Sequence, residues 1–322
     1  MIADSNGIIY CLCKDYVFPL KMTSNLVKGF FLINGLAVAF GGVLVNFFEN
    51  YLPTSVSKIF RYGKFCSNVK NKFLEKLEVP KRWFKHFYTF AGPFSTAALV
   101  LVYYRYYQSD KLPDIVVKIL KFLMGQPTLS LIPAENTIFA LILLTIHCWK
   151  RYYETHYISV FSNAYMNFTF YIIGLFHYLG TIVSIVGESY DITKDTKVDV
   201  NWTRLSLTEY TCATVLLIST YMQYRTNIIL ANLRKDKKGI VVTTNYKMPE
   251  GELFNLISGP LQLTEIIIYI CLSIILRKAY TFHYVSFWVI MNQVECAYLS
   301  HQWSVKTFKN YTNRKIILPF IF

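Results

Sequence analysis

The segments 139–146 (FALILLTI) and 147–166 (HCWKRYYETHYISVFSNAYM) follow each other without a proline or glycine at their junction. The first segment is predominantly apolar, whereas the second begins with a histidine, two basic residues and a glutamate. Because no helix breaker separates them, we expect one helix to continue from the first segment into the second. On that helix His147, Arg151 and Glu154 lie at positions i, i+4 and i+7, so their side chains project from one face.

The composition is typical of a membrane protein. Of the 322 residues, 54% are hydrophobic and only 16% are charged, and the mean hydropathy is +0.33, which is too apolar for a soluble domain of this size. The net charge of +14 does not indicate nucleic-acid binding, because the lysines and arginines lie in short segments between apolar stretches. The seven cysteines form no CxxC pair and have no histidine partners at ligand spacing, so no metal site is predicted.

Seven segments are apolar over a length close to the roughly 20 residues that cross a bilayer. They are residues 26–48, 88–107, 137–149, 160–186, 209–230, 261–276 and 280–299. A further apolar stretch, 116–131, contains two lysines, a glycine and a proline, and we expect it to be interfacial or re-entrant. The sequence therefore predicts an all-α polytopic membrane protein with about seven transmembrane helices.

The distribution of basic residues predicts how these helices are oriented. The gap 51–85 carries nine lysines and arginines against two glutamates, and the later gaps around 150 and 234 and the C-terminal tail are also basic. By parity, the N-terminal segment 1–25 and the acidic loop 188–204 are lumenal and the C-terminus is cytosolic. The short loop with Arg277 and Lys278 does not fit this pattern. We expect residues 26–322 to form one membrane domain.

Polar side chains within or beside the predicted spans lie towards the cytosolic side. Besides His147, Arg151 and Glu154, they are Gln223, Asn227, Arg234, Glu265 and His301. Each could be an interfacial anchor or a hydrogen bond between helices. A histidine or glutamate facing lipid is costly, however, and is usually turned towards protein or a hydrated cavity. Together they predict one polar pocket with a basic part that can hold phosphates.

Two other site types are disfavoured by the same residues. No G-x-G-x-x-G or G-x-x-x-x-G-K-S/T motif is present, so a bound nucleotide would not be held by a Rossmann or P-loop cradle. A transporter is disfavoured because its polar residues would lie near the midplane and not towards one side.

Several of these stretches resemble the steroid 5α-reductase family, and in particular its polyprenol reductase branch. They are RYGKF (61–65), VPKRWFKHFY (79–88), HCWKRYYETHYISVFSN (147–163), ILANLRKDKKGIVV (229–242), MPEGELF (248–254) and, within 300–322, SHQW and RKIILPFIF. The LRK and LPFIF segments are shared with the wider family. The segments PKRWFKHFY and YETHYISVFSN point to the polyprenol branch.

The resemblance implies a membrane reductase of the endoplasmic reticulum, with an NADPH-binding cavity in its C-terminal half that opens to the cytosol. The family reduces a carbon–carbon double bond next to a carbonyl, and an isolated alkene cannot accept hydride. We therefore expect the substrate to be a long-chain polyprenoid lipid, the α-unsaturated polyprenal of the dolichol pathway, which supports protein N-glycosylation. The alternatives are a steroid or enoyl-thioester reductase on the same scaffold and a non-catalytic lipid-binding membrane protein.

Such a reaction needs a group that activates the carbonyl oxygen and a proton donor for the α-carbon. Steroid-reducing relatives use a glutamate on the second helix and a tyrosine after the third-helix histidine. This sequence offers His86 and Cys148 in those regions. His86 and His301 are the predicted donors, with Glu154 and His147 as orienting or cofactor-side groups.

The resemblance implies a set of cofactor-binding residues: Arg151, Asn163, Asn227, Arg234, Lys235, Tyr246, Glu265 and Arg314. The cations among them suit the pyrophosphate and the 2′-phosphate of NADPH. Two positions depart from the family pattern, since Leu261 stands where relatives have an asparagine and Ser304 where they have a tyrosine. These departures predict an altered cofactor affinity or a reduced activity.

Overall fold

Helices make up most of the described chain. The structure, a computed structural model, describes the backbone of residues 2–3 and 9–10 and all of residues 24–53, 77–108, 111–125, 129–309, 311 and 314–321. In chain order the helices are α1 (Leu26–Phe47), α4 (Lys85–Tyr103), α5 (Asp114–Met124), α6 (Ala134–Tyr153), α7 (Phe168–Gly187), α8 (Leu207–Asn232), α9 (Pro260–Ile275) and α10 (Phe282–Thr307). Single π-helical turns, Tyr104–Gln108 and Glu154–Ile158, extend α4 and α6.

Within the described residues, two pairs of short antiparallel strands accompany the helices. Strand β1 (Ile2–Ala3) pairs with β2 (Ile9–Tyr10), and β3 (Glu78–Pro80) pairs with β4 (Tyr165–Asn167). The second pair joins the segments that lead into α4 and α7, so it fixes the starts of these two helices relative to each other. The predicted helical class is confirmed, but these strands were not predicted.

The predicted span 160–186 is helical only from Phe168 onwards. Residues 165–167 form β4, and Asn167 is the N-cap of α7, where its side-chain oxygen accepts a hydrogen bond from the backbone N–H of Thr169 at 2.8 Å. A side chain that satisfies a free N–H of the first turn favours a helix start at that point. The apolar run thus extends beyond the helix, and the first part of it connects α6 to α7 as extended chain.

Local sequence signals also set the starts of other helices. Asn25 caps α1 through its side-chain oxygen, and Ser206 and Glu209 form a capping box at the start of α8. Pro260 occupies the first turn of α9, where its missing N–H costs no hydrogen bond.

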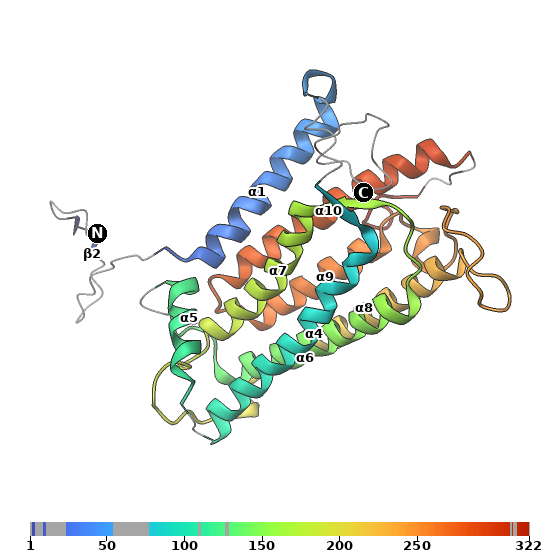
Figure 1. Cartoon of the computed structure of the whole chain (residues 1–322). Helices are drawn as coiled ribbons and strands as arrows, with labels where there is room; N and C mark the ends of the chain where they lie inside the picture. The colour runs from blue at the N-terminus through green and yellow to red at the C-terminus, as the bar shows by residue number, and fades with distance from the viewer. Residues whose placement is uncertain are drawn as a thin grey trace.

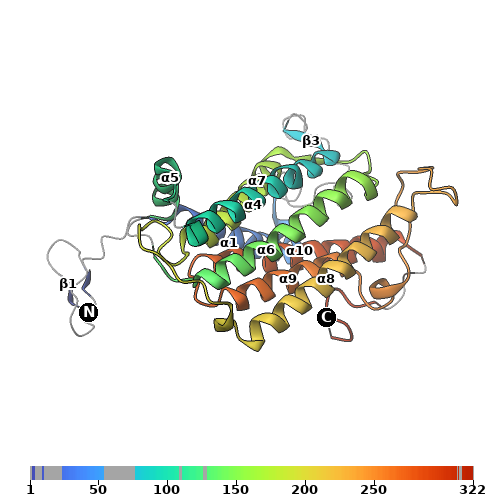
Figure 2. The ribbon, with the colours of Figure 1, turned by 90° about the horizontal axis from the view of Figure 1, so that it is seen from below.

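Helices both near and far apart in sequence lie side by side (Figures 1 and 2). Helix α1 packs along α10, α4 along α6 and α8 along α9, and α7 contacts both α4 and α10. Glycines allow two of these close approaches. A Cβ atom at Gly35 of α1 would lie 2.5 Å from a ring carbon of Phe287, and one at Gly92 of α4 would lie 3.3 Å from the ring of Trp149 on α6.

The outer faces of several helices are apolar, as lipid contact requires. On α1, Ile33 and Phe40 are each 68% exposed. Within the described residues, three helices are long and apolar enough to cross a membrane: Leu26–Phe47, Lys81–Gln108 and Phe168–Gly187. All seven predicted spans are mostly helical, but helix length and composition do not confirm the count of seven crossings. The stretch 116–131 contributes to α5, a short helix packed on α1 and α7.

The far end of α4 is tied to the loop after α7 by one buried cation. Arg105 is 2% exposed and donates hydrogen bonds to the carbonyl oxygens of Asp191 at 2.9 Å, Ile192 at 3.3 Å and Thr196 at 2.9 Å, and also to that of Lys194. These bonds compensate for the lost hydration of the guanidinium group. The loop is therefore ordered around Arg105.

Candidate functional site

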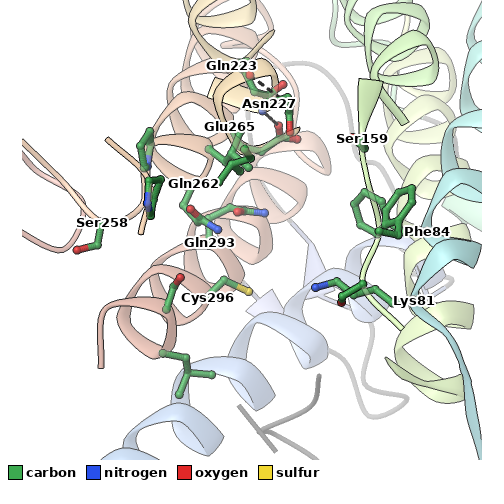
Figure 3. A pocket seen from close by; sticks show the side chains of 18 of the residues that line it. Lys81, Phe84, Ser159, Gln223, Asn227, Ser258, Gln262, Glu265, Gln293 and Cys296 are labelled. Carbon is green, nitrogen blue, oxygen red and sulfur yellow. Dashed lines mark hydrogen bonds between the residues drawn. The ribbon is translucent and has the colours of Figure 1, made fainter. Parts of the chain in front are cut away.

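A cavity of about 590 Å³ lies between α4, α7, α8, α9 and α10, at the end of the bundle where α6, α8 and α10 finish. Figure 3 shows its walls: Gln223, Asn227 and Glu265 lie together on one side, and Lys81, Phe84 and Ser159 lie across from them. Its volume falls within the range of about 300–1,000 Å³ that is usual for ligand sites. Three parts of its lining differ in chemistry.

The first part is a buried cluster at the end of α6. Arg151 donates from Nε to the hydroxyl oxygen of Tyr88 at 3.0 Å and from Nη1 to Oε2 of Glu154 at 2.5 Å. The ammonium nitrogen of Lys150 lies 3.3 Å from the other carboxylate oxygen of Glu154. Glu154 is fully buried, so its charge is stabilised by these two cations and not by water. The predicted shared face of His147, Arg151 and Glu154 is present, and all three are buried.

A second carboxylate, Glu265 of α9, lies in the same cluster. Its Oε2 accepts a hydrogen bond from the side-chain amide of Gln223 at 2.6 Å, and its Oε1 lies 3.7 Å from Nε2 of His147. The side-chain oxygen of Gln223 in turn accepts a hydrogen bond from Lys150. Gln223 thereby links the two carboxylates, and the cluster contains two acidic and two basic side chains that balance in charge. Electrostatic interactions in such a desolvated setting are strong.

The second part of the lining is basic and is formed by the chain after α8 and after α10, which we call the mouth of the cavity. The guanidinium of Arg234 lies over the ring of Tyr246, 5.1 Å from its centroid, and donates a hydrogen bond to the carbonyl oxygen of Val160. Arg314 donates to the carbonyl oxygen of Pro249 at 2.6 Å, and its guanidinium lies 5.5 Å from the ring centroid of Tyr311. Two oriented guanidinium groups of this kind suit phosphate oxygens.

The third part is apolar. It is formed chiefly by α4 and α7, and its members are Phe84, Phe87, Met166, Phe170, Ile173 and Gly174, with Val38 from α1. Gly174 lets the ring of Phe87 pack closely against α7, because a Cβ atom there would lie 2.7 Å from Cζ of Phe87. A hydrocarbon chain can lie against such a surface.

The predicted site residues fall into three groups. Six line the cavity: Arg151, Asn227, Arg234, Tyr246, Glu265 and Arg314. Three others contact a lining residue: His147 lies next to Glu265, Glu154 pairs with Arg151, and Nδ1 of His301 lies 2.7 Å from Oγ of Ser258. The last three, Asn163, Lys235 and His86, are not part of the lining. His86 faces α7, where its Nδ1 lies 3.1 Å from the hydroxyl of Tyr171.

Several lining residues were missed in the sequence. Asn292, Gln293 and Glu295 of α10, Gln262 of α9 and Tyr88 of α4 all reach the cavity. The run MNQVEC at 291–296 was a usable signal, since three polar side chains inside an apolar span are costly unless they face a polar interior.

Both departures from the family pattern, Leu261 and Ser304, also line the cavity. The described residues contain no group of three or more histidine, cysteine, aspartate or glutamate side chains that could hold a metal ion.

The chain is similar to proteins of one enzyme family. A family model described as 3-oxo-5-alpha-steroid 4-dehydrogenase matches residues 196–322. A polyprenal reductase of Drosophila melanogaster is 32% identical over the full length of both chains. The polyprenal reductase of Caenorhabditis elegans is 33% identical over 81% of this chain and 85% of its own, and that of Homo sapiens is 27% identical over 82% and 85%.

These matches define the chain as an oxidoreductase that acts on a carbon–carbon double bond, and its long apolar helices suit a membrane protein. The chain belongs to the steroid 5α-reductase family, in its polyprenal reductase branch. A nicotinamide cofactor is general to this family.

Proposed function

We propose that this protein reduces the α-isoprene double bond of polyprenal with NADPH, as a step of the dolichol pathway that supports protein N-glycosylation. The observation that carries the proposal is one continuous cavity with a basic mouth, a buried cluster of paired charges and an apolar wall. These three parts match the phosphates of a dinucleotide, a reacting polar group and a prenyl chain. The relatives named polyprenal reductase support the choice of substrate.

The lining fits a nicotinamide dinucleotide phosphate. Arg234 and Arg314 would hold the phosphates at the mouth, with Tyr246 stacked against Arg234. The carboxylate of Glu265, oriented by Gln223, is a hydrogen-bond acceptor that suits the carboxamide N–H groups of nicotinamide. When bound, the reduced cofactor supplies hydride. We assign Arg151, Asn227 and the outlying Asn163 and Lys235 to the same binding role by resemblance.

The residues of the buried cluster have distinct proposed roles. Glu154, itself paired with Lys150, fixes Arg151, and Gln223 fixes Glu265 with His147 beside it, so that both charges are held in place before substrate binds. Such preorganisation is a main source of rate enhancement in enzymes. His301, which contacts the lining residue Ser258, is the proposed proton donor for the α-carbon, whereas His86, the other predicted donor, faces Tyr171 outside the lining.

We propose that α1, α4, α6, α7, α8, α9 and α10 each cross the membrane of the endoplasmic reticulum. The mouth of the cavity and the C-terminus then face the cytosol, and the segment 1–25 and the loop 188–204 face the lumen. The support is that basic residues after α6, after α8 and after α10 share one end of the bundle. Most of the basic gap 51–85, including RYGKF, and nearly all of segment 1–25 lie outside the described residues.

A substrate panel tests the proposal. Purified full-length protein in lipid nanodiscs is given NADPH with polyprenal, a 3-oxo-4-ene steroid or an enoyl thioester, and NADPH consumption and product mass are recorded. Polyprenal alone should be turned over rapidly and gain two mass units. Turnover of only the steroid or the thioester would support a reductase of another substrate class. Binding of NADPH or lipid without any turnover would support a non-catalytic lipid-binding protein, for which the departures at Leu261 and Ser304 provide a reason.

A further inference from the structure

Reduction of a conjugated aldehyde, which rests on the proposed function, places negative charge on the carbonyl oxygen. The positions that activate this oxygen in steroid-reducing relatives do not supply a donor to the cavity here. Cys148, which follows His147, is fully buried and lies outside the lining. His86 on α4 is also outside it and faces Tyr171. Another side chain must therefore provide the hydrogen bond.

Tyr88 is the best-placed hydroxyl for this role. It lies two residues after His86 on α4, is 4% exposed and lines the cavity. The ring of Tyr178, which also lines the cavity, meets it edge-on with centroids 5.4 Å apart, and this packing fixes its orientation. Arg151 and Glu265 line the same cavity.

The bond from Arg151 determines how the Tyr88 hydroxyl can act. Nε of Arg151 donates to the phenolic oxygen at 3.0 Å, and the guanidinium lies 4.9 Å from the ring centroid. Because the oxygen accepts from Arg151, its own O–H can donate either to the neighbouring hydroxyl of Tyr178 or to an acceptor that enters the cavity. A cation bonded to the phenolic oxygen withdraws charge from it and strengthens that donation.

We propose that Tyr88 donates a hydrogen bond to the aldehyde oxygen of the prenal and stabilises the enolate that forms during reduction. In this step hydride from the reduced nicotinamide forms a C–H bond at the β-carbon. The Cα=Cβ electron pair moves to the Cα–C1 bond, and the C1=O π pair moves to the oxygen. Tyr88 keeps its proton. A separate donor then protonates the α-carbon, the C1=O bond is restored, and the products are the saturated aldehyde and the oxidised cofactor.

Replacement of the hydroxyl alone tests this assignment. Y88F retains the ring contacts and removes the donor, whereas Y106F removes a buried hydroxyl that donates to the carbonyl oxygen of Tyr190 at the far end of the same helix. With a short-chain prenal such as geranial, kcat of Y88F should fall about 100-fold, as for loss of one oxyanion donor. Its KM should change by less than about threefold, and Y106F should retain wild-type kcat.

A binding measurement separates this role from a structural one. Geranial labelled with ¹³C at the carbonyl is bound in the presence of NADP⁺, and its C=O stretch is recorded by infrared difference spectroscopy. The stretch should lie at lower frequency in wild type and Y106F than in Y88F, while NADP⁺ affinity stays the same in all three. Wild-type kcat and an unchanged stretch in Y88F would overturn the role of Tyr88 but leave the proposed function intact. Absence of turnover in the wild-type protein would instead count against the proposed function.

Discussion

Glu265 of α9 and His147 of α6 meet at the buried end of the cavity, with 3.7 Å between Oε1 and Nε2. Neither ring nitrogen of His147 has a hydrogen-bond partner among the described residues, and its ring is fully buried. The pair joins two helices separated by more than 100 positions in the sequence. The sequence placed each residue near the site, but only the fold places them against each other.

Replacement of Glu265 by glutamine should lower kcat/KM for NADPH-dependent reduction by about two orders of magnitude. The change removes one of the two negative charges that balance the cations of the cluster and weakens the hydrogen bond from Gln223, worth about 1.5–3 kcal/mol. The matched control is E252Q, because Glu252 is an exposed carboxylate paired with Arg225 outside the cavity. Steady-state kinetics that show equal kcat/KM in E265Q and E252Q would be inconsistent with a role for Glu265 in the site.

Loss of a guanidinium at the cavity mouth should weaken NADPH binding. R234Q and R314Q should each raise the dissociation constant about tenfold, since a charge-assisted hydrogen bond contributes about 1.5 kcal/mol or more. At least one of the two substitutions should weaken the binding of NADPH more than the binding of NADH, because NADH lacks the 2′-phosphate. Binding is measured by nicotinamide fluorescence, with R225Q as the control at an exposed ion pair. Equal NADPH affinity in all four proteins would remove the phosphate role from both arginines.

Filling the apolar part of the cavity should select against long substrates. G174L places a side chain where even a Cβ atom would lie 2.7 Å from Phe87, so the lining must shift or the space must close. We expect KM for a long-chain polyprenal to rise about tenfold and KM for geranial to rise less than threefold. G29L on α1 is the control, because a Cβ atom there meets nothing within 4 Å. An equal effect of G174L on both chain lengths would argue against a prenyl chain at this wall.

The loop after α7 should lose stability in acid through Asp191. Burial acts to raise the pKa of its carboxyl, but hydrogen bonds from Lys194, Thr196 and Ser130 outweigh burial, and the pKa lies below its ordinary value. A lowered pKa stabilises the fold above the ordinary value of about 4, and this stabilisation is lost as the pH falls through the lowered pKa.

The D191N variant isolates this contribution. At pH 7 it should unfold at a lower temperature than wild type in detergent, and the difference between the two should shrink as the pH falls below about 4. A difference that is constant from pH 7 to pH 3 would mean that the charge of Asp191 does not contribute. T203V, which alters an exposed residue outside this network, controls for general effects of acid.

Helices were predictable because each depends on a local apolar pattern, and all seven predicted spans are helical over most of their length. The start of α7 was not predictable in this way, because the residues 165–167 are held in extended form by pairing with the distant β3. The cavity, likewise, could be predicted only where its residues share one helix. Spacing along one helix predicted the shared face of His147, Arg151 and Glu154, whereas the contact of Gln223 with Glu265 depends on how α8 and α9 pack.

Tyr88 illustrates the limit most clearly. In the sequence Tyr88 is one of many aromatic residues near the predicted ends of the membrane spans. His86, two positions earlier, has a side chain that is a more obvious acid–base catalyst. Residues two apart on a helix point in different directions, so only one of the two can face the cavity. The rotation of α4 that selects Tyr88 is set by its packing against α6 and α7, which the sequence pattern does not encode locally.

The position of hydride addition is the most direct test of the proposed reaction. Full-length protein in nanodiscs is incubated with polyprenal and NADPH deuterated at both C4 positions, and the product is examined by mass spectrometry and ²H NMR. We expect one deuterium at the β-carbon of the α-isoprene unit and none at C1. Deuterium at C1 with the double bond retained would show reduction of the aldehyde to the allylic alcohol, and would contradict the proposed function.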